Sequence, residues 1–398
     1  MTTVETTWPL SIWQRQCMTD EQARPGVFTD PHFTINAVVA LDRPLDLVVL
    51  QRALDELLRR HEVLRTRFTE DAQVVAPRVA GVIEQVDEVG VHFPVPADSP
   101  TPLVLTVSGT TLSLHLHHLA CDPPTLWATL TELAALYTAE LGGPAVPPPS
   151  AQFGEYVLHE LEQERLGLDA ARAWWQSSLG GRRFARVRPD PGADGFEYRD
   201  ELLSAADSAA LERLARAHRG SAFTTMFAAL ACAMGPRMDG GDLIFSTVFR
   251  KRDRPQWQRM LGPCFAPTFV ALPAPPAELT AEYSRAVRDV LLKSQRHNRF
   301  DLIELRGIGP DMAESGTLRT FFELIPAERP IGLAFGPATG RVVNAAGPVM
   351  RMTTRMSVRA RGTEDGSVVG HVSGGPGGWQ ESTARQFWRD IAGMVRSE

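Results

Sequence analysis

The stretch from Leu103 to Leu141 constrains the fold of this chain more than any other. Leucines alternate with polar residues at the end of Leu103–Leu116, which predicts a strand with one buried face. Asp122-Pro123-Pro124 then marks a helix start, and apolar residues recur at helical intervals over Leu126–Leu141. A strand that leads through a short loop into a helix requires a fold that combines sheets and helices.

Similar patterns recur along the rest of the chain, so we expect a mixed α/β (α+β) fold. The expected helices are Asp46–Arg60, Tyr156–Leu179, Ala206–Arg216, Thr224–Met234 and Ala281–Arg296. The other expected strands are Ile35–Leu41, Val74–Val82, Leu243–Val248, Val349–Ala360 and Ser367–Val372. The length of 398 residues suits two lobes, and Gly180–Gly195 is a charged segment with proline and glycine. We therefore predict an N-terminal lobe over 1–180 and a C-terminal lobe over 181–398, with a site between them.

Charge, cysteines and the N-terminus exclude several classes of function. The formal charge is −6 and the charges are intermixed, which argues against a nucleic-acid partner. The four cysteines lie far apart without metal-ligand spacing, so we expect neither a metal site nor disulfides. The first residues lack a signal-peptide pattern, and the most apolar window is too short for a bilayer. We expect a cytoplasmic protein that has no membrane contact.

The sharpest chemical feature is the loop His117-His118-Leu119-Ala120-Cys121-Asp122. A loop between a strand and a helix holds side chains rigidly, which suits a catalytic base. Imidazole fits this role because its ordinary pKa of about 6.5 leaves the neutral form dominant near neutral pH. On the residues alone, two histidines at a strand end and an aspartate that caps the helix are an equally good interpretation.

Further motifs resolve this choice, because together they resemble the condensation domains of non-ribosomal peptide synthetases. The stretch RHEVLRTRF at Arg60–Phe68 and the loop HHLACD carry the resemblance. Weaker matches, which extend it over about residues 8–304, are Ser11–Arg15, Phe153–Tyr156, Trp174-Trp175, Arg252–Pro255, Leu261–Phe265 and His297–Phe300.

The resemblance implies two chloramphenicol-acetyltransferase-like lobes that form a V around a central tunnel. It places His118 beside the reacting thioester and amine, as the main member of a catalytic pair with His117, whose own role is more one of packing. It pairs Asp122 with Arg252 from the other lobe as structural residues at the site. Arg60, His61 and Glu62 are also expected to be structural. The expected tunnel residues are Ser11, Cys121, Pro123 and Pro267.

Two positions depart from the family pattern. Pro123 stands where the family has glycine, and Pro267 stands where it has asparagine. Proline adds a ring and removes an N–H, so Pro123 should reshape the entry of a phosphopantetheine arm, although proline is favoured at a helix start.

The resemblance implies a free-standing acyltransferase of specialised metabolism. It would join an acyl or aminoacyl thioester on a carrier protein, met in trans, to a small-molecule amine or alcohol. The protein itself would need no cofactor, since the phosphopantetheine arm belongs to the carrier. One alternative is a non-catalytic module that recruits a carrier or a tailoring enzyme. Another keeps the fold but catalyses epimerisation, cyclisation or elimination on a tethered intermediate.

Overall fold

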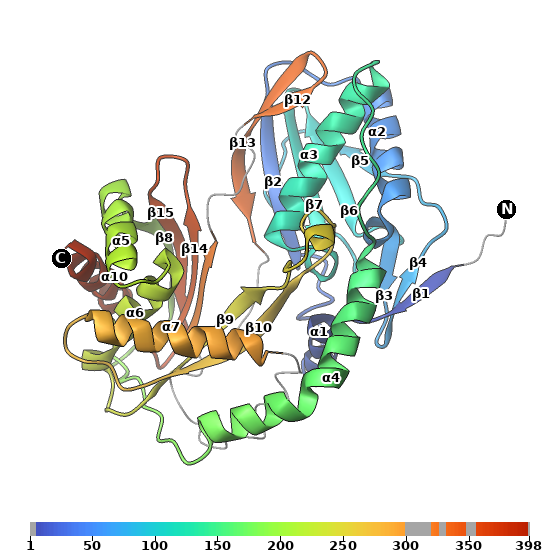
Figure 1. Cartoon of the computed structure of the whole chain (residues 1–398). Coiled ribbons are helices and arrows are strands. Elements are labelled where there is room, and N and C mark those ends of the chain that lie inside the picture. Colours follow the sequence, from blue (N-terminus) through green and yellow to red (C-terminus); the bar gives the residue numbers. More distant parts are fainter. Residues whose placement is uncertain (1–4, 299–319, 326–331, 348–355, 397–398) are drawn as a thin grey trace. The chain divides into compact units, whose positions relative to one another are not determined.

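The computed structural model describes residues 5–298, 320–325, 332–347 and 356–396. The chain forms two compact units, and each is discontinuous in sequence. The first consists of Met1–Arg165, Arg250–Phe265 and Glu328–Arg351, and the second of Leu166–Phe249, Ala266–Ala327 and Met352–Glu398. This division differs from the predicted one at residue 180, because two segments from the C-terminal half fold with the N-terminal residues. The expected mixture of helices and sheets is confirmed (Figure 1).

A six-stranded sheet forms the centre of the first unit. Its strand order is β12-β13-β2-β7-β6-β5. The strands are β2 (Thr34–Leu41), β5 (Val82–Gln85), β6 (Leu103–Ser108), β7 (Thr111–His117), β12 (Leu333–Phe335) and β13 (Ala338–Ala346). The predicted single strand Leu103–Leu116 is wrong, because it is the hairpin of β6 and β7. Gly109 turns the chain there with a φ of +54°, a conformation that glycine adopts without strain.

Four helices of the described residues belong to this unit. They are α1 (Ile12–Ala23), α2 (Leu47–Arg60), α3 (Pro123–Glu140) and the first part of α4 (Phe153–Leu179). Of these, α3 contacts β2, β7 and β12 of the sheet, and α2 packs on α3. Asp46 caps α2 by accepting the N–H groups of Val48 and Val49, as its sequence predicts. A small sheet has the order β1 (Thr6–Pro9), β4 (Ala72–Val75), β3 (Thr66–Phe68). The predicted strand Val74–Val82 is also wrong, since β4 ends at Val75 and β5 begins at Val82.

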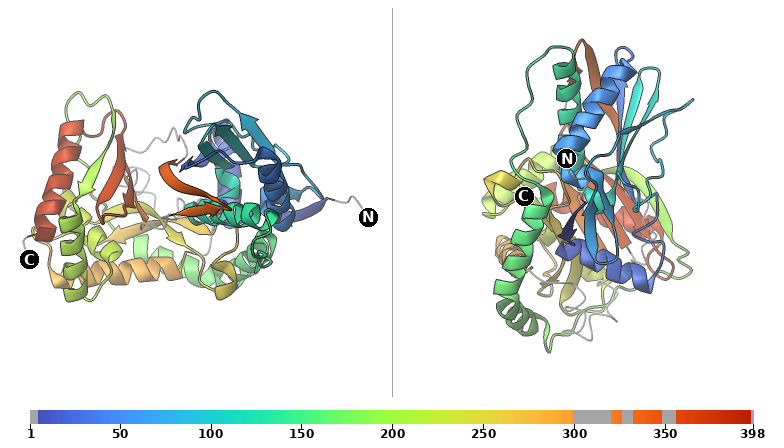
Figure 2. Two further views of the ribbon diagram at one scale, coloured as in Figure 1. Left: turned by 90° about the horizontal axis from the view of Figure 1, so that it is seen from above. Right: turned by 90° about the vertical axis from the view of Figure 1, so that its right-hand side faces the viewer.

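The second unit has its own six-stranded sheet, of order β10-β9-β11-β14-β15-β8. The strands are β8 (Phe196–Leu203), β9 (Leu243–Arg250), β10 (Phe265–Leu272), β11 (Thr320–Ile325), β14 (Met356–Gly362) and β15 (Val368–Gly374). Three helices, α5 (Ala205–Ala217), α6 (Ala222–Met234) and α10 (Glu381–Arg396), lie together beside β8 and β15, and α7 (Ala281–Arg296) packs on α6 (Figures 1 and 2). Part of the predicted strand Val349–Ala360, residues 349–355, lies outside the described residues.

Each unit buries a hydrophobic core of its own. In the first, leucines of α2 and α3 and alternate residues of β2, β6 and β7 are buried together. In the second, nearly all of α6 is buried among β9, β14 and α10. Within the described part of the chain, we find no helix that is both long and apolar enough to cross a membrane.

Candidate active site

His118 occupies the first position of a short 3₁₀ turn that follows β7. Its backbone N–H donates to the carbonyl of Phe33 at 2.7 Å, and this bond fixes the turn to the start of β2. Its ring Nδ1 lies 2.6 Å from the carbonyl oxygen of Cys121, which can only accept. Nδ1 therefore carries the hydrogen, and in the neutral ring Nε2 carries the lone pair. The loop thus selects the tautomer in which Nε2 is the basic nitrogen.

Three aromatic rings surround the His118 imidazole. The centroids of Trp13, Phe33 and Phe265 lie 5.1, 5.0 and 5.8 Å from that of His118, and Phe265 is nearly parallel to it. Trp13 also contacts Phe265, with 4.6 Å between ring centroids. These rings come from α1, from the residue before β2, and from the chain after β9. Sequence analysis did not assign them a role, although Trp13 and Phe265 lie within motifs that it identified.

His117 is not suited to acid–base chemistry, contrary to its inclusion in the catalytic pair. Its side chain is fully buried, and its Nδ1 accepts the N–H of Leu119 at 3.3 Å. Burial, assisted by the neighbouring His118, lowers the pKa of His117 to about 3. A ring that stays neutral at every ordinary pH and faces the interior is structural. The catalytic role expected of His118 stays a prediction.

Asp122 and Arg252 form the predicted ion pair, and both side chains are almost completely buried. The Nη2 of Arg252 lies 2.9 Å from Oδ1 and 3.2 Å from Oδ2 of Asp122. Oδ2 also accepts the N–H of Cys264 at 3.0 Å. Burial opposes the charge of the guanidinium, but the Asp122 carboxylate outweighs it and raises the pKa of Arg252.

The origin of Arg252 corrects the expectation that it comes from the other lobe. Arg252 belongs to the same compact unit as Asp122, because Arg250–Phe265 folds with the first unit. Its guanidinium also donates to the carbonyls of Trp257 and Met260. The segment that follows β9 therefore folds around the Arg252 side chain. The pair therefore holds two distant parts of one unit together.

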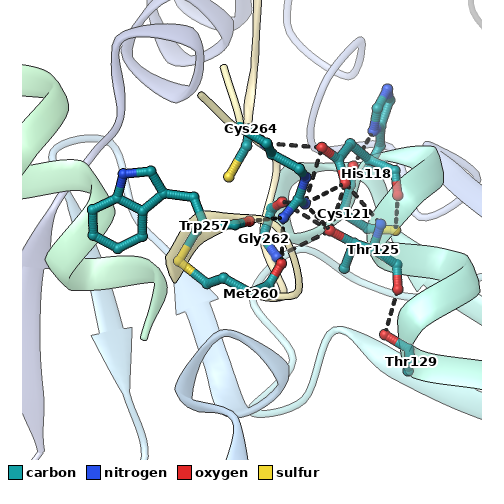
Figure 3. A network of polar contacts seen from close by, with 10 residues as sticks. His118, Cys121, Thr125, Thr129, Trp257, Met260, Gly262 and Cys264 are labelled. Atoms are coloured by element: carbon teal, nitrogen blue, oxygen red, sulfur yellow. Dashed lines mark hydrogen bonds and ion pairs between the residues drawn. The ribbon is translucent and has the colours of Figure 1, made fainter. Parts of the chain in front are cut away.

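Thr125 and Gly262 complete this network (Figure 3). Sequence analysis missed Thr125 and included Gly262 only as part of a motif, without a role. The Thr125 hydroxyl lies 2.5 Å from Asp122 Oδ1 and 2.8 Å from the Gly262 carbonyl, and accepts the Gly262 N–H at 3.0 Å. Gly262 has a φ of +135°, and a Cβ there would lie 2.2 Å from a ring carbon of Phe153. Glycine is thus required at 262 by both conformation and space. The only sequence signal was the Leu261–Phe265 motif.

Cys121 and Cys264 are buried on either side of Asp122, which excludes a nucleophilic thiolate. Burial, together with the nearby Asp122 carboxylate, raises the pKa of the Cys121 thiol well above its ordinary value. The same effect of burial raises the pKa of Cys264. The expectation that Cys121 is a small buried residue is confirmed, and its burial removes it from any surface that meets substrate.

Ser11 caps a helix instead of lining a tunnel, which corrects its assignment. The residue is 1% exposed, and its hydroxyl accepts the N–H of Gln14 while Gln14 Oε1 accepts the N–H of Ser11. The other end of the Gln14 amide donates to the Leu119 carbonyl at 2.8 Å. Glu160 accepts the N–H of Ile12, the next residue of the turn, at 3.0 Å. The start of α1 is thereby fixed to the histidine loop.

The two prolines that depart from the family pattern lie in different units. Pro123 is the first residue of α3, behind the Asp122 cap, and is partly exposed. Pro267 lies on β10, an edge strand, where a missing N–H is tolerated.

The charged RHE segment is structural, as expected. Arg60 donates to Glu132 at 2.6 Å, His61 lies 3.0 Å from the same carboxylate, and Glu62 accepts the Trp8 indole N–H. Among the residues that the structure describes, no group of three His, Cys, Asp or Glu side chains is placed to bind a metal.

Comparison with solved structures shows which known folds this chain resembles. The chain is similar to the condensation domain of monacolin K polyketide synthase MokA, with a TM-score of 0.80, 15% identity, and coverage of 100% of this chain and 98% of that one. It is also similar to the X-domain that was solved in complex with OxyB from teicoplanin biosynthesis, with a TM-score of 0.75, 19% identity, and coverage of 100% and 94%.

Sequence comparison names the family. The family model of the condensation domain matches residues 103–324, more than half of the chain, and the chain therefore belongs to the condensation domain family. Tyrocidine synthase 2 of Brevibacillus parabrevis is 26% identical over 316 residues, which are 72% of this chain and 9% of that protein. The chain thus spans about a tenth of the length of this non-ribosomal peptide synthetase relative.

Proposed function

We propose that this condensation domain is an acyltransferase that forms an amide, or less readily an ester, from a carrier-bound thioester. The observation that carries the proposal is the fixed tautomer of His118. Its Nδ1 donates to the Cys121 carbonyl, so that Nε2 is the nitrogen able to accept a proton. Three aromatic side chains pack around the ring and hold it in this orientation.

The reaction that fits this group is attack of an amine on a thioester carbonyl. The amine nitrogen forms a bond to the carbonyl carbon, and His118 Nε2 accepts the proton that the nitrogen loses. The carbon–sulfur bond then breaks, and the proton passes to the sulfur of the leaving thiol. The products are an amide and the free thiol of the phosphopantetheine arm. His118 supplies a base and a hydrogen bond at one atom, and no other acid–base side chain is needed.

The partners follow from this chemistry. A thioester on a carrier protein is the proposed donor, and a small amine or alcohol is the proposed acceptor. The relationship to tyrocidine synthase 2 supports a role in peptide assembly.

The test uses intact-protein mass spectrometry of an acyl-loaded carrier, incubated with the protein and a panel of amines. We expect the wild type to unload the carrier and to release an amide, and the His118→Ala variant to lose this activity by a factor of about 100 or more. Gln16→Met, on the same helix as Trp13 but outside the network, serves as the control. Full turnover by His118→Ala would refute the assigned role.

A second candidate function is recruitment of a carrier or tailoring enzyme without catalysis. Pro123 favours it, because a ring now stands beside Asp122 where the family has glycine. The similarity to the X-domain that was solved with OxyB gives this candidate a structural parallel. If Pro123 hinders the arm, Pro123→Gly should increase turnover, whereas Pro124→Ala, one residue further on, should not. Tight carrier binding with no unloading by any variant would favour recruitment.

The mass of the carrier also separates acyl transfer from other reactions. Epimerisation would leave the mass of the loaded carrier unchanged, and elimination would lower it without releasing an amide. Release that depends on the added amine is the outcome expected for acyl transfer.

A further inference from the structure

A buried carboxyl group on α4, that of Glu160, joins this helix to the start of α1. Glu160 is 8% exposed. Its Oε2 accepts the backbone N–H of Ile12 at 3.0 Å, and its Oε1 accepts the Tyr156 hydroxyl at 2.9 Å. A more exposed bond, from Arg15 to Glu164, joins the same two helices, which lie side by side (Figure 1). The α4 helix therefore sets where α1 begins.

The first turn of α1 contacts the histidine loop at two points. The Gln14 amide donates to the Leu119 carbonyl at 2.8 Å, and the Trp13 ring packs on the His118 ring with 5.1 Å between centroids. Any change in the position of this turn is therefore passed on to the loop and to the imidazole.

The Tyr156 hydroxyl connects Glu160 to the second support of the loop, the segment after β9. The Tyr156 ring meets the Trp257 ring edge-on, with 5.7 Å between centroids. The Trp257 carbonyl accepts a bond from Arg252 at 2.9 Å, and Arg252 is paired with Asp122. All of these residues belong to the first unit. The Glu160 carboxyl thus lies where two routes to the histidine loop meet.

We propose that Glu160 is a positioning residue that keeps α1 and the segment after β9 in register and thereby aligns the His118 ring. It acts through Ile12 and Tyr156 and takes no part in the bond changes. The expected effect on turnover rests on the proposed acyl transfer, whereas the orientation of the His118 ring can be measured without it.

The test is NMR of the full chain carrying ¹³C at the histidine ring Cε1, with the His118 signal assigned by its loss in His118→Ala. Aromatic rings that surround a proton displace its signal from the position found in an unfolded chain. Glu160→Met keeps the length of the side chain but removes both acceptors. We expect it to shift the His118 signal toward the position measured in urea, because Trp13 is no longer held against the imidazole.

Glu160→Gln is the conservative variant that should restore the wild-type signal. Its amide can accept the Ile12 N–H and donate to the Tyr156 oxygen. Burial is the main cause that raises the pKa of the Glu160 carboxyl, and a neutral amide costs less to bury. Val157→Ala is the control for a general weakening of α4, since Val157 is fully buried and apolar. It should lower the urea midpoint without moving the His118 signal.

A cycle with Gln14→Met tests the route through α1. In that background, Glu160→Met should shift the His118 signal less than it does in the wild type, because the helix no longer holds the loop. Full additivity of the two shifts would overturn the proposal. In the assay of acyl transfer, we expect Glu160→Met to lower kcat by about tenfold or more with little change in KM, and Glu160→Gln to keep kcat.

If Glu160→Met does not fold, Tyr156→Phe takes its place, since it removes only one of the two bonds and should shift the His118 signal in the same direction. An unchanged signal in the folded variant, or an equal shift in Val157→Ala, would overturn the proposal. A shifted signal in a protein whose wild type transfers no acyl group would support the positioning role and refute the acyl transfer alone.

Discussion

At the scale of single residues, the most consequential group is the Asp122 carboxylate. It accepts hydrogen bonds from Arg252, from the Thr125 N–H and from the Cys264 N–H. A buried ion pair is costly to break, because removing one charge leaves the other unpaired in the interior. We expect Asp122→Asn to lower the free energy of unfolding by about 3–5 kcal/mol, measured by urea denaturation. Glu162→Gln, which breaks the exposed pair with Arg165, should leave the midpoint unchanged.

The decisive comparison is a double-mutant cycle with Arg252→Met. If the ion pair accounts for the loss, the two single variants together should lose more unfolding free energy than the double variant does. The difference should be at least about 1 kcal/mol. Simple additivity would show that Asp122 acts as a helix cap alone.

His117 gives the fold a dependence on pH. Its pKa is about 3 in the folded protein and about 6.5 in the unfolded chain, so the folded state binds fewer protons. Stability is therefore lost as pH falls below about 6.5, by about 2 kcal/mol at pH 5. Between pH 7 and pH 5, we expect the free energy of unfolding of His117→Gln to fall by about 2 kcal/mol less than that of the wild type. Urea denaturation at each pH would measure this difference.

Ser113→Ala is the control for this prediction, since Ser113 lies on the same face of β7 and does not titrate. The neighbouring His115, whose pKa burial lowers to about 4, should keep its own contribution in both variants. If wild type and His117→Gln lost equal amounts of unfolding free energy between pH 7 and pH 5, the His117 ring would have to be protonated in the folded state as well.

At the scale of elements, α1 positions the histidine loop. Gln14 links the Ser11 N–H to the Leu119 carbonyl, one residue after His118. We expect Gln14→Met to lower the free energy of unfolding by about 1–3 kcal/mol, because it leaves these buried groups unpaired. If the histidine loop loses its position, Gln14→Met should lower the kcat of acyl transfer more than it changes KM. Single-turnover kinetics would measure the loss in the chemical step.

Gln16→Met isolates the contribution of that bond. Gln16 lies on the same helix and is 9% exposed, whereas Gln14 is fully buried. Its substitution should change neither stability nor kcat appreciably, and an equal effect of both substitutions would assign the loss to packing of α1.

The sequence predicts helices better than strands, for physical reasons that particular elements show. The helix Ala281–Arg296 is predicted to the residue, because its amphipathic spacing and Thr280 cap are local signals. Strands β12 and β13 escape prediction, since β12 pairs only with β13, and β13 pairs with β2 across about three hundred positions of the sequence. The site shows the same contrast. The motifs identify His118, Asp122 and Arg252, but the aromatic ring of Phe33 comes near His118 only through the pairing of β2 with β7.

At the scale of the whole molecule, the path of the chain joins the two units. The first unit requires Arg252 and strand β13, both of which come after residue 180. We expect residues 1–180 expressed alone to show no cooperative urea transition by circular dichroism, since β2 would have an open edge and Asp122 no charge partner. Co-expression with residues 181–398 should restore it. A cooperative transition in the shorter fragment alone would show that Arg250–Phe265 and Glu328–Arg351 are dispensable.

The same path limits how genes for such domains can be recombined. A single crossover near residue 165 would transfer most of the first unit but leave Arg250–Phe265 and Glu328–Arg351 from the other parent. Asp122 of one parent would then face Arg252 and Gly262 of the other, in a network that tolerates little change of shape. Chimeras should succeed when all three segments are exchanged together, or when the crossovers fall outside the domain. The histidine loop and its distant supports are therefore expected to be inherited as one block.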